Sequence, residues 1–290
     1  MAEGALAGKV AIVTGGGRGL GRAMVLALAG AGADVVCAAH IDTDFAEVKA
    51  VHRKLGKAGR LLTHKMDVRS AKECDALIAA AKKAFGPADI LVNNAGLTFT
   101  YIWPDLYRRP QKPHFWEHED DIIENVVAVN FLGAERLARR AVPAMLDKGW
   151  GRVINVTTKL STMRFPWSSP YGPSKAALEQ ASDNWAQDLA GTGVSVNILN
   201  PGGGADTPGM ADEMREKSRT MKKPLLMAPV KMMAPVVWLA SHASDGVNGM
   251  RYDAQDWNEK KSPAVEARRI GRPVGFLLRP RKKPAAKKTR

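Results

Sequence analysis

The sequence predicts an α/β fold in which a doubly wound parallel sheet of about seven strands carries helices on both faces. Three observations lead to this fold class. Short β-branched and apolar runs such as Val10-Ala11-Ile12-Val13 lack polar alternation, which is typical of strands buried on both faces. These runs alternate with stretches of helical length, and a glycine-rich turn joins the first run to the first helix. Strands that alternate with helices indicate a parallel sheet.

The expected elements keep this alternation along the chain. The expected strands span residues 9–14, 34–39, 61–66, 89–92, 152–157, 194–199 and 249–252. The expected helices span residues 20–31, 44–55, 70–85, 120–146, 171–189 and 229–241. Pro173 lies in the first turn of one helix, where a missing N–H costs little, so we expect that helix to begin close to Tyr171.

One domain followed by a tail is the expected organisation. A chain of 290 residues that is 45% hydrophobic can bury a full core, and the predicted elements form a single domain over residues 1–257. Two long connections interrupt it: residues 97–116 are polar and aromatic and look like an insertion, and residues 205–227 are rich in Met. Residues 258–290 are dominated by Pro, Ala, Lys and Arg without periodicity, which indicates a flexible basic tail.

The charge belongs mainly to that tail. The chain has a net charge of +14, and ten Lys and Arg with no acidic residue lie between Arg268 and Arg290. Such a segment can bind nucleic acid or simply remain a solvated end. Cys37 and Cys74 are too few for a disulfide framework. We expect a cytoplasmic protein, because no signal peptide is evident and no apolar run reaches the ~18 residues of a membrane helix.

A glycine-rich turn, Thr14-Gly15-Gly16-Gly17-Arg18-Gly19-Leu20-Gly21, lies between the first strand and the first helix. Glycines there allow the backbone to approach a pyrophosphate closely, and the helix N-terminus supplies N–H donors and positive dipole. The turn therefore predicts a phosphate-binding site. A tight turn without a ligand remains the alternative.

Tyr171 and Lys175 are candidate residues for proton transfer. Residues four apart share one face of a helix, so Lys175 can lie beside Tyr171. A nearby cation favours the phenolate and lowers the pKa of a tyrosine from its ordinary value near ~10. The pair then serves as a general acid and base. The same spacing also arises by chance in many helices, so the pair depends on its surroundings.

Four motifs in order carry a family resemblance: the glycine turn with the spacing Thr-Gly-x-x-x-Gly-x-Gly, Asn93-Asn94-Ala95-Gly96 after the fourth strand, Asn130 in the next helix, and Tyr171-x-x-x-Lys175. Over about residues 9–253 the chain resembles the classical short-chain dehydrogenase/reductase (SDR) family. The resemblance implies a Rossmann-type fold with a nicotinamide dinucleotide across the carboxyl ends of the strands. It further implies a small-molecule carbonyl or alcohol substrate, and we expect a homo-oligomer, either a dimer or a tetramer.

The resemblance also implies the roles of the catalytic residues. Hydride would pass between the nicotinamide and a carbonyl carbon, and Tyr171 would protonate the nascent alkoxide or deprotonate an alcohol. Lys175 would bind the nicotinamide ribose and lower the pKa of Tyr171, and Asn130 would hold a water in a proton relay. Thr158 stands thirteen residues before Tyr171, where the family has Ser, and keeps the hydroxyl. Thr157 is the alternative hydroxyl.

The expected cofactor-binding residues match the family positions around the dinucleotide. They are Gly15, Arg18, Gly19, Leu20, Gly21, His40, Asp67, Val68, Asn94, Ala95, Gly96, Tyr171, Lys175, Pro201 and Gly202. Asn93 is also expected beside the adenosine ribose. Asp67 matches a position that contacts the adenine, although it can instead cap the helix that begins near Ser70.

The end of the second strand predicts a preference for NADP. A carboxylate there binds the 2′-hydroxyl of NAD and repels a 2′-phosphate, which favours a cation. The matching position is Ala39, followed by His40, and Arg18 lies in the glycine turn. These residues favour NADP, whereas Asp42 leaves NAD possible.

Three segments can shape a substrate pocket: residues 165–167, residues 97–116 and the chain after Pro201-Gly202. Their aromatic and Met content favours an apolar substrate, although packing or subunit contacts explain it equally well. His114, Glu117 and His118 have a spacing compatible with a metal, but further ligands are not evident and we expect no metal. The alternative function is a non-catalytic nucleotide sensor or scaffold that acts through its basic tail.

Overall fold

The structure is a computed structural model, and it describes residues 4–56 and 59–276. Its centre is an eight-stranded sheet with the order β3-β2-β1-β4-β5-β6-β7-β8, in which β1 to β7 are parallel and β8 is antiparallel to β7. The strands are β1 (Val10–Thr14), β2 (Asp34–Ala39), β3 (Leu61–Lys65), β4 (Ile90–Asn93), β5 (Gly151–Asn155), β6 (Val194–Asn200), β7 (Met250–Asp253) and β8 (Arg272–Pro273). The expected doubly wound parallel sheet is confirmed, and β8 adds a short further strand.

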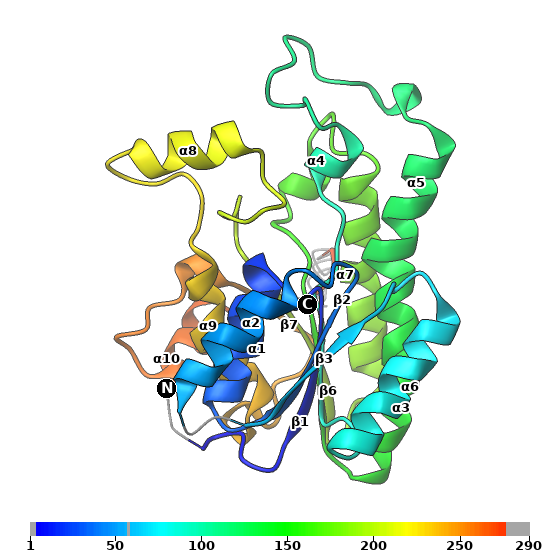
Figure 1. Cartoon of the computed structure of the whole chain (residues 1–290), viewed down its shortest axis with the longest axis vertical. Helices are drawn as coiled ribbons and strands as arrows, with labels where there is room; N and C mark the ends of the chain where they lie inside the picture. Colours follow the sequence, from blue (N-terminus) through cyan, green and yellow to red (C-terminus); the bar gives the residue numbers. More distant parts are fainter. Residues whose placement is uncertain (1–3, 57–58, 277–290) are drawn as a thin grey trace, which may run out of the picture.

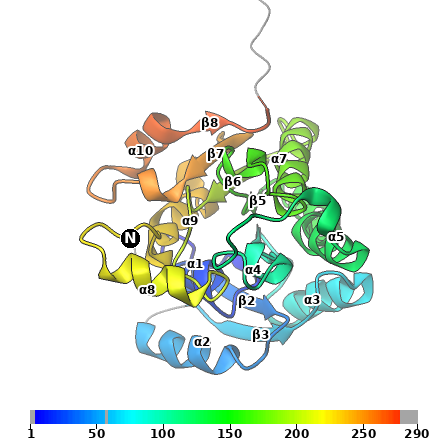
Figure 2. The ribbon, with the colours of Figure 1, turned by 90° about the horizontal axis from the view of Figure 1, so that it is seen from above.

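Helices cover both faces of the sheet (Figure 1). One face carries α1 (Gly19–Gly30), α2 (Phe45–His52), α9 (Met233–Ala240) and α10 (Pro263–Ile270). The other face carries α3 (Ala71–Ala84), α6 (Gly133–Asp147) and α7 (Tyr171–Asp188), with α5 (Asp120–Val127) beside α7. Seen from above, the same two layers lie on either side of the strands (Figure 2).

Alternate residues of each strand enter different cores. Ala11 and Val13 pack into the core under α1 and α9, whereas Ile12 packs into the core under α3 and α6. Successive side chains of a strand point to opposite faces, so a strand covered on both sides must be apolar at every position. All five residues of β1 are buried, which explains the absence of polar alternation in its sequence.

The two long connections contain short helices. Residues 97–116 include α4 (Phe99–Ile102), and residues 205–227 include α8 (Asp212–Thr220). Both helices lie beyond one end of the sheet, at the top of Figure 1. The single helix expected over residues 120–146 is also divided, because a π-helical stretch at Ala128–Leu132 separates α5 from α6. Asn130 lies in that stretch.

The folded chain continues beyond residue 257, where we expected the domain to end. Helix α10 buries Glu266, Ala267 and Ile270, and Val274 after β8 is also buried. The sequence signals were a proline at the first position of α10 and an apolar pair at helical spacing, too short a pattern to stand out from the surrounding charges. The remainder of the expected tail, residues 277–290, lies outside the described residues.

The strand order reverses between β1 and β4, which are neighbours in the sheet. In open α/β sheets this switch point leaves a crevice beyond the carboxyl ends of the strands, where ligands bind. The glycine-rich turn after β1 and Asn94-Ala95-Gly96 after β4 both begin at this edge. In the part of the chain described here, every helix is too short or too polar to cross a lipid bilayer.

Candidate active site

The glycine-rich turn is shaped by backbone that only glycine permits. Gly15 and Gly19 have φ of +60° and +56°, in the left-handed region. A Cβ on Gly21 would lie 2.1 Å from the carbonyl oxygen of Gly15, so the turn and the first turn of α1 leave no room for a side chain there. The first turn of α1 carries no acidic residue, so its positive dipole end is not neutralised locally. This arrangement fits the pyrophosphate of a dinucleotide.

Asn94 and Thr14 lock the turn to the adjacent strand end. The Asn94 amide Nδ2 donates to the carbonyls of Thr14 at 2.9 Å and Gly15 at 3.1 Å. In return the Thr14 hydroxyl accepts from the backbone amides of Asn94 and Ala95, both at 3.0 Å. Asn93, which we also expected at the cofactor, is buried at the end of β4 and donates to Asn155 on the neighbouring strand β5 at 2.9 Å.

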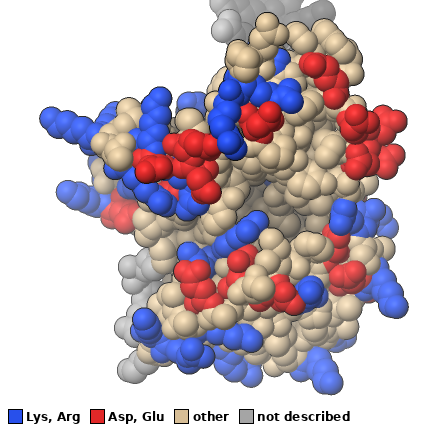
Figure 3. Space-filling view, turned by 45° about the horizontal axis from the view of Figure 1, so that its top comes forward, with Lys and Arg blue, Asp and Glu red and all other residues tan. Residues whose placement is uncertain are grey.

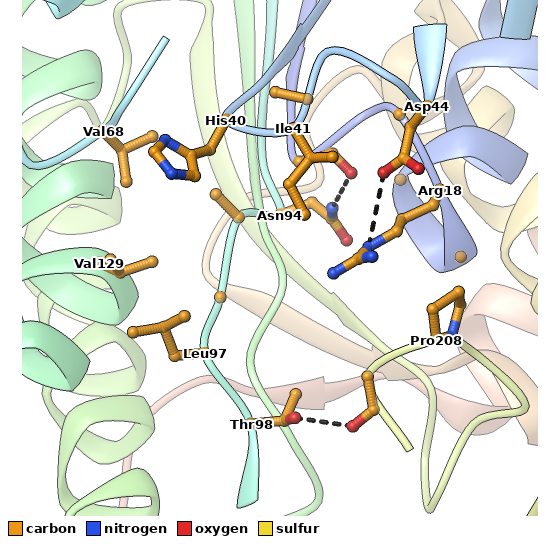
Figure 4. Close-up of a pocket in the computed structure, with 18 of the residues that line it drawn as sticks. Arg18, His40, Ile41, Asp44, Val68, Asn94, Leu97, Thr98, Val129 and Pro208 are labelled. Atoms are coloured by element: carbon orange, nitrogen blue, oxygen red, sulfur yellow. Dashed lines mark hydrogen bonds and ion pairs between the residues drawn. The ribbon is translucent and has the colours of Figure 1, made fainter. Parts of the chain in front are cut away.

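A cavity of about 540 Å³ opens at this switch point. Eleven of the expected cofactor residues line it: Gly15, Arg18, Gly19, Leu20, Gly21, His40, Asp67, Val68, Asn94, Ala95 and Gly96. Figure 4 shows Arg18 and Asp44 on one side of the cavity and Val68, Val129 and Leu97 on the other. In the space-filling view a hollow opens in the middle of the face, with basic and acidic side chains interspersed around it (Figure 3).

Further residues line the cavity beside those expected at the cofactor. They include Ile41, Asp44, Arg69, Leu97, Thr98, Thr100, Tyr101, Val129, Thr207, Pro208 and Gly209. Those at 97–101 and 207–209 belong to two of the segments that we expected to shape a substrate pocket. Sequence reasoning missed Ile41, Asp44, Arg69 and Val129, although the first two follow the end of β2 directly.

Charged groups gather at the end of β2. The Arg18 Nε lies 3.6 Å from an Asp44 oxygen, and the His40 Nδ1 lies 3.9 Å from an Asp67 oxygen. Asp42 instead pairs with Lys65 at 2.9 Å and is not among the lining residues. Ala39 lines the cavity, so this end of β2 presents no carboxylate of its own.

The Asp67 carboxylate is held by Arg69, while the Asp67 backbone amide donates to Glu73 of α3 at 2.8 Å. Partial burial acts to raise its pKa, but hydrogen bonds from Arg69 outweigh burial and hold the pKa of Asp67 below its ordinary value. The cap of α3 is Ser70, whose hydroxyl accepts from the Glu73 amide at 3.2 Å. The alternative reading of Asp67 as a helix cap is therefore wrong, and its carboxylate remains at the cavity wall.

Tyr171 and Thr158 meet at the start of α7. Burial raises the pKa of Tyr171 to about 12, against an opposing hydrogen-bond interaction with the Thr158 side chain. The expected lowering of the Tyr171 pKa is not found, because desolvation of the phenolate dominates. Thr157 is not the partner of Tyr171, because its hydroxyl donates to Glu179 at 3.1 Å.

Lys175 is only 4% exposed and donates to the Val156 carbonyl at 2.9 Å. Burial lowers its pKa to about 8, since the charged ammonium loses hydration. Lys175 does not line the cavity directly but stands behind its wall. A Cβ on Gly96 would lie 3.3 Å from the Lys175 Nζ and 3.3 Å from the Asn130 Oδ1, so the lack of a side chain at this lining residue leaves both groups close to the cavity wall.

Asn130 ties three segments together. Its Oδ1 accepts from the Leu97 amide at 2.7 Å, and its Nδ2 donates to the Leu97 carbonyl at 3.1 Å and the Ser174 hydroxyl at 3.0 Å. The π-helical stretch places this side chain between the end of β4 and α7. Its side-chain atoms are thus engaged with protein groups in this structure.

Aromatic side chains cover Tyr171. The Phe99 ring centroid lies 4.6 Å from that of Tyr171 and 5.4 Å from that of Trp167, and Phe165 packs on Trp167 at 5.5 Å. The expected insertion 97–116 and residues 165–167 therefore form one apolar wall beside the phenol. Pro201 and Gly202 lie outside the cavity lining, where Gly202 packs against Gln255. Residues 4–56 and 59–276 contain no cluster of three metal-ligating side chains that would include His114, Glu117 and His118.

Comparisons with known proteins agree with this geometry. The model of the short chain dehydrogenase family matches residues 9–219. Ketoacyl reductase HetN of Nostoc sp. is 31% identical over 68% of this chain and 64% of its own length, slightly under two thirds. NADPH-dependent aldehyde reductase 2 (chloroplastic) of Arabidopsis thaliana is 32% identical over 84% of this chain and 91% of its own. An uncharacterized NAD-dependent oxidoreductase of Mycobacterium tuberculosis is 31% identical over 85% of this chain and 94% of its own.

Among solved structures, levodione reductase superposes with a TM-score of 0.72 over 84% of this chain and 94% of its own. At 23% identity this likeness concerns the fold. The glycine turn, the switch-point cavity and the family match over most of the chain lead to one conclusion. The chain belongs to the short chain dehydrogenases, a family of NAD(P)-dependent oxidoreductases.

Proposed function

We propose that this protein catalyses hydride transfer between NADP(H) and a carbonyl or secondary alcohol substrate, with Tyr171 as the general acid and base. The observation that carries the proposal is the meeting of Tyr171 and Thr158 at the start of α7, with Lys175 behind the Gly96 wall of the dinucleotide cavity. A pure sensor has no use for a phenol that meets a threonine hydroxyl, with a buried ammonium four residues further along the same helix.

Each group has a distinct task in this proposal. The bound dinucleotide supplies or accepts the hydride. Tyr171 donates its phenolic proton to the substrate oxygen during reduction, and the Thr158 hydroxyl holds that oxygen by a hydrogen bond. A pKa of about 12 keeps Tyr171 protonated at neutral pH, the form that reduction requires. Lys175 stands where its ammonium can reach a ligand past Gly96, so it would hold the nicotinamide ribose.

The NADP preference rests on the end of β2. Ala39 offers no carboxylate to repel a 2′-phosphate, and Arg18 and His40 both line the cavity. Asp44 opposes the preference because it also lines the cavity and lies 3.6 Å from Arg18. We expect kcat/KM to be larger for NADPH than for NADH, to fall for NADPH alone in Arg18→Ala, and to rise for NADPH in Asp44→Asn. A larger kcat/KM for NADH in the wild type would reverse the assignment.

The substrate class follows from the wall around Tyr171. Phe99, Phe165 and Trp167 offer ring surfaces rather than charges next to the phenol. We expect aromatic and long-chain aldehydes and ketones to be reduced with larger kcat/KM than short carbonyl compounds that carry a carboxylate. Burial of apolar surface contributes about 25 cal/mol per Å², which makes the size of the apolar group the main variable.

The proposal is tested by the oxidation of NADPH in the presence of a carbonyl panel, followed by absorbance. Tyr171→Phe removes the phenolic oxygen alone and should abolish turnover while NADPH still binds. Tyr252→Phe is the matched control, because it removes the same atom from a buried tyrosine of the core. Turnover in Tyr171→Phe equal to that of the wild type would exclude Tyr171 as the proton donor.

A further inference from the structure

Two buried charged side chains form a pair directly behind Thr158. Glu179 on α7 is 0% exposed and Arg251 on β7 is 3% exposed, and the Arg251 Nη1 lies 2.6 Å from the Glu179 Oε1. Burial acts to raise the pKa of Glu179, against the attraction of Arg251. Charges are costly to bury, so a fully buried pair that does not touch the cavity calls for a physical reason.

The pair holds the two threonines at the end of β5 from two sides. The Thr157 hydroxyl donates to the Glu179 Oε2 at 3.1 Å, and the Arg251 Nη2 donates to the Thr158 carbonyl at 3.0 Å. The side chain of one residue and the backbone of the next are thereby fixed together. The backbone direction at Thr158 sets where its hydroxyl points, and that hydroxyl is the group that interacts with Tyr171.

The pair also extends a row of contacts along α7. Ser182 accepts from Asn155 at 2.8 Å, Lys175 donates to the Val156 carbonyl, and Glu179 accepts from Thr157. Positions 175, 179 and 182 share one face of the helix. The helix that begins with Tyr171 therefore contacts three consecutive residues, from Asn155 at the end of β5 to Thr157, and Arg251 on β7 contacts the fourth, Thr158.

We propose that the Glu179–Arg251 pair is a positioning device that aims the Thr158 hydroxyl at Tyr171, acting through the Thr157 side chain and the Thr158 carbonyl. This inference rests on the proposed function of Tyr171 and Thr158. It assigns no contact with substrate or cofactor to either charged residue. The sheet strand β7 and the catalytic helix α7 thus jointly set the geometry at the phenol.

The test uses variants that remove the pair without leaving one buried charge. All test variants and the control are made in an Asp253→Asn background, because Asp253 is 8% exposed and its Oδ1 lies 3.7 Å from the Arg251 Nη2, so its carboxylate would otherwise lose this partner. The double variant Glu179→Gln with Arg251→Met removes both charges and keeps side chains of similar size, a change that buried pairs often tolerate. Thr157→Val removes only the tether and leaves the pair intact. Arg152→Met is the matched control, because Arg152 is also buried, at 2% exposure, but lies at the opposite end of β5 and pairs with Asp245.

The first readout needs no turnover. In protein with 13C-labelled tyrosine, the Tyr171 Cζ resonance, assigned with Tyr171→Phe, reports the hydrogen bonding of the phenol. We expect it to move in the double variant and in Thr157→Val and to stay in place in Arg152→Met. An unchanged resonance in both test variants, or an equal change in the control, would overturn the inference even if the wild type reduces carbonyls.

The second readout separates positioning from folding. A misplacement of about 1 Å at a reacting group can cost on the order of 100-fold in rate. We expect kcat for carbonyl reduction to fall by that order in the double variant while the Kd for NADPH stays within about twofold. Equal losses of kcat and NADPH affinity would show a structural role only. If the wild type reduces no carbonyl, the proposed function fails, and the Tyr171 resonance alone decides this inference.

Discussion

Burial acts in opposite directions on the two ionisable groups at the start of α7. It raises the pKa of Tyr171 to about 12 and lowers that of Lys175 to about 8, because in each case the neutral form is favoured. The sequence predicted both residues and their spacing. It could not predict these shifts, because they arise from burial by residues such as Phe99, which lies 72 positions before Tyr171 in the chain.

The pKa of Lys175 makes stability depend on pH. The unfolded chain keeps the proton up to its ordinary pKa of 10.5, whereas the folded chain releases it near pH 8. Between these values the unfolded state binds more protons, so this group makes the protein more stable as the pH rises. Between pH 8 and 10.5 we expect the unfolding free energy of the wild type to rise by about 3 kcal/mol relative to the unfolding free energy of Lys175→Met. A difference that stays constant with pH would contradict the buried lysine.

Gly21 tests the backbone of the phosphate turn. A Cβ there would meet the Gly15 carbonyl at 2.1 Å, so Gly21→Ala must displace the turn. We expect it to raise the Kd for NADPH by at least about tenfold and to destabilise the fold by ~1–3 kcal/mol. Gly30→Ala, in the last turn of the same helix with no atom within 4 Å of its Cβ, should instead be neutral or stabilise by about 0.4–1 kcal/mol. Titration by NADPH fluorescence and thermal unfolding would show whether the two variants behave alike.

At the scale of elements, the sequence predicted the helices and turns whose formation depends on neighbouring residues. The strand-turn-helix unit around the glycines and the start of α7 at Tyr171 appear in the structure close to their expected positions. The division of the helix at Asn130 was not predictable, because its π-helical stretch is held by contacts with Leu97 and Ser174, which lie 33 and 44 residues away. Helix α10 was missed because its apolar face is only a few residues long.

The two loops over the cavity are fastened to each other. The hydroxyls of Thr98 and Thr100 donate to the Gly209 carbonyl at 2.7 and 2.9 Å, across more than a hundred residues of sequence. Arg108 and Glu213 add an exposed ion pair at 2.8 Å between the same loops. Thr98, Thr100 and Gly209 all line the cavity. The hydrogen bonds between them therefore close one of its sides.

Removal of both hydroxyls should loosen that closure. Each hydrogen bond contributes about 1 kcal/mol net, so Thr98→Val with Thr100→Val should raise the Kd for NADPH on the order of tenfold, mainly through faster release. Thr220→Val is the control, since Thr220 donates only to the Lys217 carbonyl within α8. Stopped-flow displacement of NADPH measures the release rate. Equal rates in the wild type and the double variant would show that the loops do not retain the cofactor.

At the scale of the whole molecule, the strand order explains why distant motifs meet. The reversal between β1 and β4 brings the glycine turn and Asn94 to Gly96 to one crevice, and the next strand, β5, carries Thr158 to the same end. The sheet and the order of its motifs were predictable from the sequence. The buried pair of Glu179 and Arg251 was not, because the two residues are 72 positions apart and neither belongs to a recognisable motif.

Deletion of the basic tail distinguishes the two candidate functions, an enzyme and a scaffold that acts through its C-terminus. The described fold is complete by Val274, which is buried against the body of the protein. We expect deletion of residues 277–290 to leave kcat/KM for carbonyl reduction unchanged within about twofold. The measurement compares both chains with the same carbonyl and NADPH. A loss of carbonyl reduction on deletion would instead place part of the catalytic function outside the described residues, and the absence of carbonyl reduction in both chains would favour the scaffold.

The central claim is that hydride passes directly between the nicotinamide and a carbonyl carbon held beside Tyr171. Its most direct test is the mass of the product alcohol formed from NADPH that carries deuterium at both positions of nicotinamide C4. The account predicts that the alcohol made by the wild type carries deuterium on the former carbonyl carbon and that Tyr171→Phe makes none. An alcohol without deuterium, or labelled alcohol from Tyr171→Phe at the rate of the wild type, would contradict it.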